Sequence, residues 1–438
     1  MLKKNLNVRF LITGLSLVLL CFTTACKNTT TDPFNNGSQT RNEIVVISDI
    51  HCGANLAYAE MNYDRAPLAR FLEKVRTSKN VKELVMAGDI VDEWFVPAPV
   101  DTYYGHDQST FVDSVAASNK VIFDKINEII KEGIIKVTYV PGNHDLAVTA
   151  ANINRIMPGV NQARDNGLLG LGTYHPDNYP QIAIEHGHRY DIVCAPDPIA
   201  NQDTAPGTIL PAGYFSTRIA TLHVVQGCTQ NIDSFPVVTQ NTSGGDDQYL
   251  MFKYWQAAIG VLQKLPINNH FNEKIIVTHV NGFTRNYSLD DILPYQTTPG
   301  GTILAKLYND MPAHWAERCV RNNVPVPIAA DFALKMLTTV DTMAYLQYFN
   351  NPASNVRIVV FGHTHFATLQ TYLNHSGQKS IYANSGTWID QIIPPATTHM
   401  NFIVITPQGA DATSQTSVAV YNFQGEVFNK MQVELLRL

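Results

Sequence analysis

Short apolar runs alternate with amphipathic stretches in the first third of the chain. Residues 44–48, 84–87 and 136–140 are aliphatic or β-branched runs of the kind that forms buried strands. Between them, residues 65–77 and 111–132 carry apolar side chains at helical spacing. This β-α-β-α-β order predicts a sheet in which neighbouring strands are parallel.

After Asp145 this rhythm breaks. Residues 181–185 still predict a strand, but residues 190–248 are rich in Asn, Gln, Thr, Asp, Gly and Pro and show no clear element. A stretch of that length is typical of a functional insertion. The later pattern predicts further elements, namely helices at 249–265 and 332–349 and strands at 274–278, 357–361, 380–384, 401–405, 417–422 and 431–436, the last ones mostly paired as hairpins.

These elements predict a layered α/β (α+β) fold over residues 43–438, with insertions at about 190–273 and 280–350. Residues 27–41 are rich in Asn, Thr, Ser and Gly, so residues 26–42 are expected to form a flexible tether.

The first 25 residues predict a signal peptide. Lys3, Lys4 and Arg9 form a basic segment, and an apolar stretch of signal length follows at 10–22. Small residues then precede Cys26, as in a bacterial lipoprotein signal, although Thr23 stands where such signals usually carry Leu. We therefore expect an exported protein anchored to a membrane through a lipidated Cys26, in the periplasm or at the outer membrane or cell surface. The alternative is an ordinary secretory signal with an incidental cysteine.

The charge of the mature chain limits its partners. Without residues 1–25 there remain 28 basic and 37 acidic side chains, a net charge of about −9 with neutral histidines. This balance argues against a nucleic-acid-binding surface, which is normally basic. A small phosphorylated substrate is still compatible, because bound metal ions supply local positive charge.

The cysteines indicate no structural zinc site. Apart from Cys21 and Cys26 the chain has Cys52, Cys194, Cys228 and Cys319, and none forms a C-x-x-C pair. Cys194 and Cys228 both lie in the first insertion and could be bridged in an exported protein.

Five short motifs carry the chemistry, and three of them directly follow predicted strands. They are Asp49-Ile50-His51, Gly88-Asp89-Ile90-Val91-Asp92, Gly142-Asn143-His144-Asp145, His186-Gly187-His188 and Gly362-His363-Thr364-His365. Side chains at the ends of parallel strands meet at one edge of a sheet. The shared site is expected to hold oxygen and nitrogen donors and no thiolate, which favours Zn, Mn or Fe over Ca.

Asp92 allows two interpretations. It lies three residues after Asp89, so a turn would direct its carboxylate back towards the site. It is equally suited to cap the N-terminus of a helix.

In this order the motifs resemble the calcineurin-like metallophosphoesterase superfamily, over residues 49–365 with the insertions unmatched. The resemblance implies a two-sheet β-sandwich flanked by helices and a site with two divalent metal ions. Asp49, His51 and His365 would hold the first ion, with Asp89 as the bridging carboxylate. Asn143, His363 and a histidine from the middle of the chain would hold the second. His144 would contact the scissile phosphate or its leaving group, with Asp92 orienting its ring.

Two histidines compete for the middle position. His186 belongs to a His-Gly-x segment similar to that of some members of the superfamily, whereas others use a strand-end histidine resembling His279. We favour His186 and keep His279 as the alternative.

The resemblance implies hydrolysis of phosphomonoesters or phosphodiesters by a hydroxide that bridges two metal ions, on a phosphorylated small molecule or a lipid-linked substrate. The alternative is an exported binding lipoprotein that retains the fold but has little or no activity. The presence of His144 favours the enzyme, because a binding protein could lose this residue at no structural cost.

Overall fold

A computed structural model describes residues 32–35, 37, 39–226, 235–263, 272–335, 337–391, 398–409, 411 and 413–438. The predicted signal peptide, Cys26 and Cys228 lie outside these ranges, and so does the predicted disulfide. Among the described cysteines, Cys52, Cys194 and Cys319 form no disulfide with one another. Within the described ranges, no helix combines the length and the apolar character needed to cross a membrane.

The first sheet has seven strands in the order β13-β12-β11-β1-β2-β3-β4. Strands β1 to β4 are mutually parallel, and β11 to β13 add to β1 in antiparallel fashion. Their bounds are β1 Glu43–Ile47, β2 Val81–Ala87, β3 Lys136–Val140, β4 Asn161–Gln162, β11 Asn401–Thr406, β12 Thr416–Gln424 and β13 Val427–Leu436.

The second sheet has the order β5-β8-β10-β9, in which only β9 is antiparallel to its neighbour. Its strands are β5 Ile182–Ile184, β8 Ile358–Phe361, β9 Thr368–Leu373 and β10 Lys379–Asn384. Ile44 and Val46 of β1 share a buried cluster with Val360 of β8 and Ile381 of β10. The two sheets therefore pack face to face, which confirms the predicted two-sheet sandwich.

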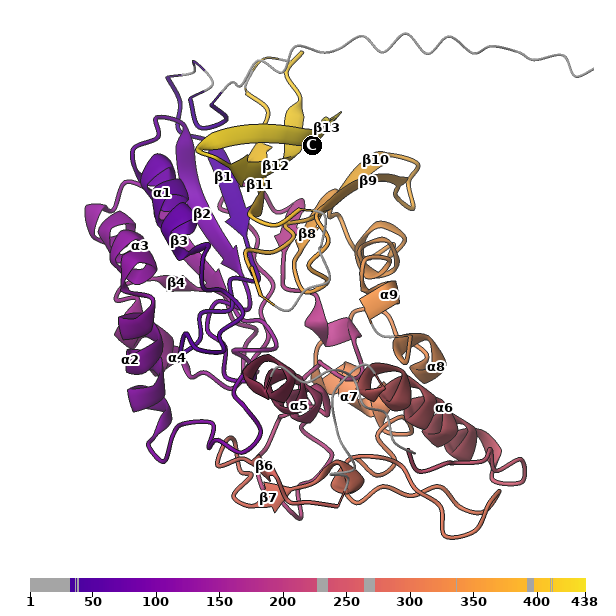
Figure 1. Cartoon of the computed structure of the whole chain (residues 1–438). Coiled ribbons are helices and arrows are strands. Elements are labelled where there is room, and N and C mark those ends of the chain that lie inside the picture. Colours follow the sequence, from indigo (N-terminus) through magenta and orange to yellow (C-terminus); the bar gives the residue numbers. More distant parts are fainter. Residues whose placement is uncertain are drawn as a thin grey trace, which may run out of the picture.

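Helices cover the outer face of the first sheet (Figure 1). In β1, Val45 and Ile47 alternate with the residues that face the second sheet, and they belong to the buried cluster that includes Leu68 and Phe71 of α1. Both faces of β1 are buried, so the strand is apolar throughout. The helices on this side are α1 Arg65–Arg76, α2 Gln108–Ser118, α3 Lys120–Glu132 and α4 Ala150–Ile156.

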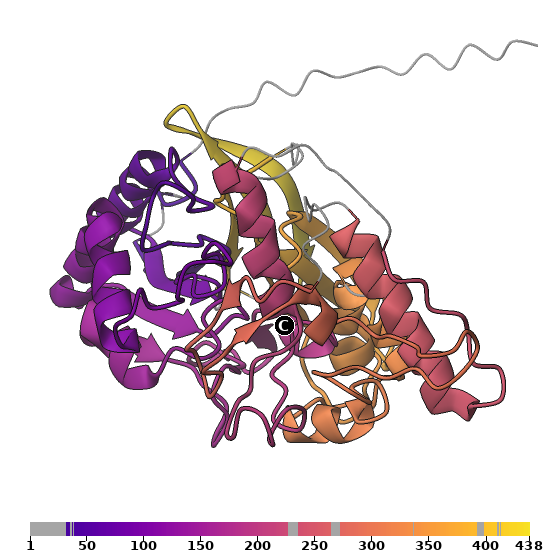
Figure 2. The same ribbon diagram turned by 60° about the horizontal axis from the view of Figure 1, so that its bottom comes forward.

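Most elements of the insertions lie beyond the strand ends (Figures 1 and 2), whereas the π-helix η3 (Ala344–Phe349) packs beside β9 and β10 of the second sheet. Their elements are η1 His188–Tyr190, α5 Gly213–Gln226, α6 Gly245–Leu262, β6 Ile276–Val277, β7 Asn286–Tyr287, η2 Leu289–Asp291, α7 Trp315–Arg321, α8 Ala330–Ala333, α9 Leu337–Val340 and the π-helix η3 Ala344–Phe349. β6 and β7 pair as a small antiparallel sheet.

Several predicted elements were wrong. The helix at 111–132 is two helices, because Asn119 leaves helical geometry between α2 and α3. The helix at 332–349 is three short segments, and the strand at 274–278 shrinks to the two residues of β6. The polar stretch 190–248 contains α5 and the start of α6, and strand β9 had not been predicted.

Candidate metal centre

Five strand ends converge on one place, at the edge of the sandwich that faces the insertions (Figure 1). β1, β2 and β3 of the first sheet lead into Asp49, Asp89 and Asn143, and β5 and β8 of the second sheet lead into His186 and His363. Both sets of strands are parallel, so their carboxyl ends meet at a shared edge.

The backbone at this edge is strained. Asp49, His51, Asp89, His363 and His365 all have positive φ, between 51° and 68°. Residues other than Gly rarely adopt this conformation, and such residues concentrate at functional sites. The tight turns aim these side chains inward from the strand ends.

The glycine of each of three motifs is explained by close approach. A Cβ at Gly88 would lie 2.4 Å from His186 Nδ1, and one at Gly142 would lie 2.1 Å from Asp89 Oδ1. A Cβ at Gly362 would lie 2.5 Å from Asp49 Oδ2. Only a residue without a side chain leaves room for these ligands.

Asp49, His51 and His365 form the first group of donors. His365 Nε2 lies 3.1 Å from Asp49 Oδ1 and 3.3 Å from His51 Nε2. Asp49 and His51 are fully buried, and 26% of the His365 side chain is exposed. The group therefore opens to solvent on the His365 side.

Asp89, Asn143, His186 and His363 form the second group. His186 Nε2 lies 3.1 Å from both Asp89 Oδ2 and Asn143 Oδ1, and His363 Nδ1 lies 2.9 Å from Asn143 Oδ1. His51 Nε2 lies 3.6 Å from the same Asp89 oxygen. Asp89 thus lies between the two groups.

Hydrogen bonds fix the other ring nitrogens of these histidines. His51 Nδ1 lies 2.9 Å from Asp92 Oδ2 and 3.0 Å from Glu60 Oε2, and His186 Nδ1 lies 2.8 Å from the carbonyl oxygen of Ala87. A proton on Nδ1 would donate to Asp92 in His51 and to Ala87 in His186, and would leave the Nε2 lone pair free for a metal ion. The structure thus gives both rings the tautomer that a ligand needs.

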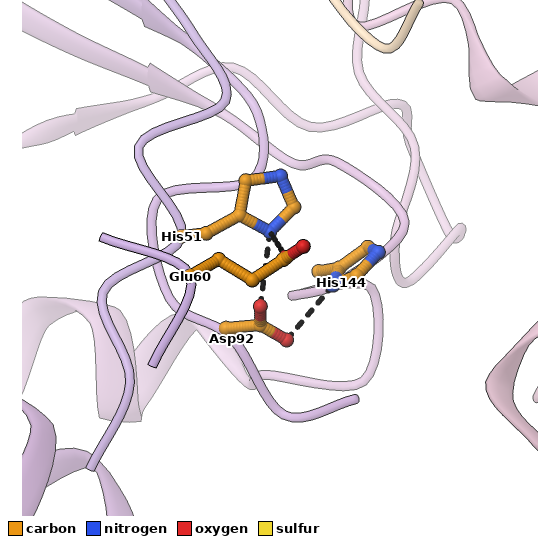
Figure 3. Close-up of side chains that lie close together, drawn as sticks. All are labelled: His51, Glu60, Asp92 and His144. Atoms are coloured by element: carbon orange, nitrogen blue, oxygen red, sulfur yellow. Dashed lines mark hydrogen bonds and ion pairs between the residues drawn. The ribbon is translucent and has the colours of Figure 1, made fainter. Parts of the chain in front are cut away.

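Asp92 connects His51 to His144 (Figure 3). Its Oδ2 contacts His51, while its Oδ1 lies 2.8 Å from His144 Nδ1. Oδ1 also accepts hydrogen bonds from the backbone N–H groups of Trp94 and Phe95. No helix begins at this position, so Asp92 orients a turn and two imidazoles instead of capping a helix.

Three contacts hold His144 in place, and its Nε2 atom takes part in none of them. Its backbone N–H donates to Asp89 Oδ1 at 2.8 Å, and its ring stacks on Trp94 with centroids 4.9 Å apart. With Nδ1 bonded to Asp92, Nε2 is the ring nitrogen that remains available. Burial lowers the pKa of His144, but the charges of Asp92 and Asp89 together with the hydrogen bond to Asp92 raise it above its usual value.

The carboxylates of the site are stabilised as anions by the histidines. Burial alone raises the pKa of Asp89, yet the neighbouring His186 and His144 hold that pKa well below its usual range. The reciprocal effect is seen at His186, where burial lowers the pKa and the charges of Asp89 and Asp49 raise it to about 9.

The structure brings His186 into the cluster and does not do so for His279. His279 follows β6 in the insertion layer, where its half-exposed ring pairs with Asp101. Four groups of donors close enough to hold a metal ion occur among the described residues, and none includes His279.

Three further side chains reach the site without a motif to mark them. Glu60 contacts His51 from the loop after β1, and Asp191 Oδ2 lies 3.4 Å from His363 Nε2, in a group with Cys194. Asp191 follows the His186-Gly187-His188 motif at a distance that a short helical turn brings back to the site. Nothing in the sequence around Glu60 distinguishes it from a surface residue.

These donors fit divalent metal ions. Asp49, Asp89 and His186 offer ligand atoms that lie within 4.8 Å of one another, and all three residues are buried. Two buried carboxylates this close repel each other, and a cation between them relieves that repulsion. The mixture of imidazole, carboxylate and amide donors suits Zn, Mn or Fe.

One family model matches this chain. Residues 43–221 match the model of the calcineurin-like phosphoesterase family, so the chain carries a calcineurin-like phosphoesterase domain. Among solved structures, the nuclease MPE of Pseudomonas putida is similar, with 14% sequence identity and a TM-score of 0.20. The match covers 33% of this chain and 53% of the nuclease, about half of its length. No curated protein matches the chain.

Proposed function

We propose that this protein is a metal-dependent phosphoester hydrolase with two divalent ions, Mn, Fe or Zn, in its site. One observation carries the proposal. The loops after five strands, drawn from both sheets, bring all seven predicted ligands together beside a histidine that is positioned but is not needed as a ligand. Nε2 of His144 is not bonded to any of the described residues, so it is available to a phosphate oxygen.

Asp49, His51 and His365 would hold the first ion, and Asn143, His186 and His363 the second. Asp89, which lies within 3.6 Å of His51 Nε2 and 3.1 Å of His186 Nε2, is the carboxylate placed to serve both. When bound, the two ions would supply Lewis acidity and a nucleophilic hydroxide near neutral pH.

The chain's own residues complete the site. Asp92 fixes the ring of His144 so that Nε2 points away from the carboxylate, where it can donate a hydrogen bond to a phosphate or leaving-group oxygen. Trp94 limits the rotation of this ring by stacking on it. A donor held in this way stabilises charge that develops during hydrolysis, without having to be reoriented.

The ligand assignment is tested by metal content. Purified protein should hold about two ions per chain by elemental analysis, and chelation should abolish hydrolysis of aryl phosphates. His186→Ala should reduce the content towards one ion per chain. His279→Ala is the matched control and should keep both ions. Loss of an ion from His279→Ala alone would reverse the assignment, and full activity without any metal would refute the proposal.

We also propose that the chain is exported and anchored through a lipidated Cys26. The basic, apolar and small-residue segments before Cys26 support this proposal. A lipoprotein carries several acyl chains and binds membranes stably, whereas one chain binds only marginally. Cys26→Ser should therefore move the protein from the membrane to the soluble fraction, and a wild-type protein that is already soluble would contradict the proposal.

A further inference from the structure

A pocket opens directly beside the candidate metal centre. Its volume is about 240 Å³, and Asn143, His144 and Trp94 line its end nearest the metal centre. The remaining wall comes from the insertions, chiefly from α5, α6 and the segment around η2. In Figure 1 these helices lie below the ends of the strands that carry the predicted ligands.

The wall of this pocket is apolar. Val193, Ala258, Val261, Leu289, Ile292 and Leu334 are among its side chains. Of the described residues that line it, none is Asp, Glu, Lys or Arg. A phosphate group has no cationic side chain to bind in this space, so a ligand here must offer an apolar surface.

Most of the few polar side chains in the wall are bonded to the protein itself, and the Ser216 hydroxyl is the exception. Thr217 Oγ1 donates to the carbonyl oxygen of Gly213 at 3.1 Å, and the Tyr254 hydroxyl donates to that of Ile292 at 3.4 Å. The amide oxygen of Asn143 faces His186 and His363. The Ser216 hydroxyl could serve one polar group of a sugar or a nucleobase, but most of its polar groups would have no partner here, which disfavours such a ligand by roughly 1–3 kcal/mol per unpaired group.

The size of the pocket matches one apolar group of moderate size. An apolar cavity of roughly 150 Å³ is enough to hold benzene, and this pocket is larger. His144 lies at the junction, so it contacts the pocket on one side and the proposed phosphate position on the other. An apolar group in the pocket would therefore be joined to the phosphate at His144.

We propose that the substrate is an amphiphilic phosphoester whose alkyl or aryl group enters this pocket while its phosphate binds at the metal centre. This proposal rests on the proposed phosphoesterase function. On this proposal, one ester group of the substrate is apolar, whereas an enzyme for polar phosphate esters would have a polar pocket.

The test is a chain-length series. Ethyl, butyl, hexyl and octyl phosphate, and the matching p-nitrophenyl diesters, are compared below their micelle concentrations with the metal-loaded full chain. Each methylene that enters the pocket should raise kcat/KM by about three- to fourfold, until the pocket is full. Naphthyl phosphate extends the series and shows whether an aryl group is accepted as well as an alkyl chain.

A substitution that fills the pocket gives a second test of the pocket assignment. Ala258→Phe projects a ring from α6 into the space, so the ratio of kcat/KM for octyl to that for ethyl phosphate should fall towards one. Gln256→Phe places the same ring on the exposed side of the same helix and should keep the wild-type ratio. Ser216→Leu narrows the pocket from α5 and serves as the second variant if Ala258→Phe does not fold.

Binding of octylphosphonate and ethylphosphonate, which cannot be hydrolysed at a P–O ester bond, separates the two proposals. Tighter binding of octylphosphonate supports the pocket assignment, even if no ester is hydrolysed and the phosphoesterase function fails. Equal kcat/KM for ethyl and octyl esters, with phosphate released from both, overturns the pocket assignment and leaves the function standing. No hydrolysis and equal affinities overturn both.

Discussion

The carboxylate of Asp92 orients two histidines and one turn of the site. Its two oxygens orient His51, a predicted ligand, and His144, a predicted catalytic residue, and it also holds the turn that carries Trp94. Burial raises the pKa of Asp92, but the charges and hydrogen bonds of His144 and His51 lower it far more. This lowered pKa favours the ionised carboxylate, the form that accepts hydrogen bonds from both imidazoles.

His144→Ala separates catalysis from metal binding. The substitution should lower kcat by roughly 10²–10⁴-fold, the usual loss for a positioned acid or charge stabiliser. Both ions should stay bound, because the ring is not needed as a ligand. Metal analysis and steady-state kinetics on one preparation measure both effects.

The exposed His106 gives a matched control, since His106→Ala should change neither kcat nor metal content. Loss of an ion from His144→Ala would show that its ring, or the loop it anchors, belongs to the metal shell.

Glu93 makes stability depend on pH. Burial, with the nearby carboxylates of Asp145 and Asp92, raises its pKa to about 7, although hydrogen bonds from Tyr103 and Gln108 oppose the shift. The folded pKa is above the unfolded one, so the unfolded chain loses this proton first as pH rises. The free energy of unfolding should therefore fall between about pH 4.5 and pH 7 and then level off.

Glu93→Gln removes this titration and retains an oxygen that can accept from Tyr103 and Gln108. At pH 8 the variant should be more stable than the wild type by up to roughly 3 kcal/mol, and the difference should disappear towards pH 4.5. Urea unfolding of both chains in chelator across this range measures it. A difference that does not vary with pH would show that Glu93 does not titrate there.

At the scale of elements, the break between α2 and α3 has a specific cause. Asn119 is fully buried, and its side-chain amide donates to the carbonyl oxygens of Gly53 and Val115, both at 2.9 Å. Gly53 follows Asp49 and His51 in the loop after β1. The break thus ties the helical layer to the loop that carries two predicted ligands.

Asn119→Ala should destabilise the protein by roughly 1–3 kcal/mol, because it leaves the buried carbonyl of Gly53 without a donor. The midpoint of urea unfolding measures this loss. Lys120→Ala, one residue on and exposed, should stay within roughly 0.5 kcal/mol of the wild type. Equal midpoints for the two variants would show that the hydrogen bond to Gly53 contributes nothing.

The sequence predicted best those strands whose two faces are both buried. The strands at 44–48, 136–140 and 357–361 are mostly apolar or β-branched because both of their faces pack, and each was predicted close to its observed position. The helix break was hidden, since apolar residues before and after Asn119 keep a helical spacing. Strand β9 was missed because most of its side chains are exposed or half-buried, so no apolar run marks it.

The same contrast holds for the site. The structure brings together the seven residues that motifs pointed to, because each motif follows a strand end. Glu60 could not be found, since it reaches the site from a loop whose course depends on tertiary packing, and Asp191 was missed although it directly follows the short helical turn after the His186 motif.

At the scale of the whole molecule, the predicted ligands join the two sheets. Asp49, Asp89 and Asn143 follow strands of the first sheet, whereas His186 and His363 follow strands of the second. Metal binding would add links between the sheets at the edge where the buried core between them ends. Ions bound only by the folded protein stabilise it by mass action.

Chelation should therefore lower Tm as well as abolish activity. Free metal a thousandfold above its dissociation constant stabilises by about 4 kcal/mol per site, so removal should lower Tm by roughly 5 °C or more. Calorimetry with chelator, and again after Mn or Zn is restored, measures the change. His186→Ala should show a smaller shift than the wild type, and an unchanged Tm after chelation would mean that metal does not link the sheets.

Ligands for the metal centre and walls for the apolar pocket come from different stretches of the chain. The predicted ligands follow the strands of the sandwich. Most residues that line the pocket belong to α5, α6 and their neighbours. Mutations in the insertions can therefore reshape the pocket without moving a ligand. In the evolution of such proteins, the reacting group and the group that selects the substrate can diverge independently, so relatives with an identical metal centre need not share a substrate.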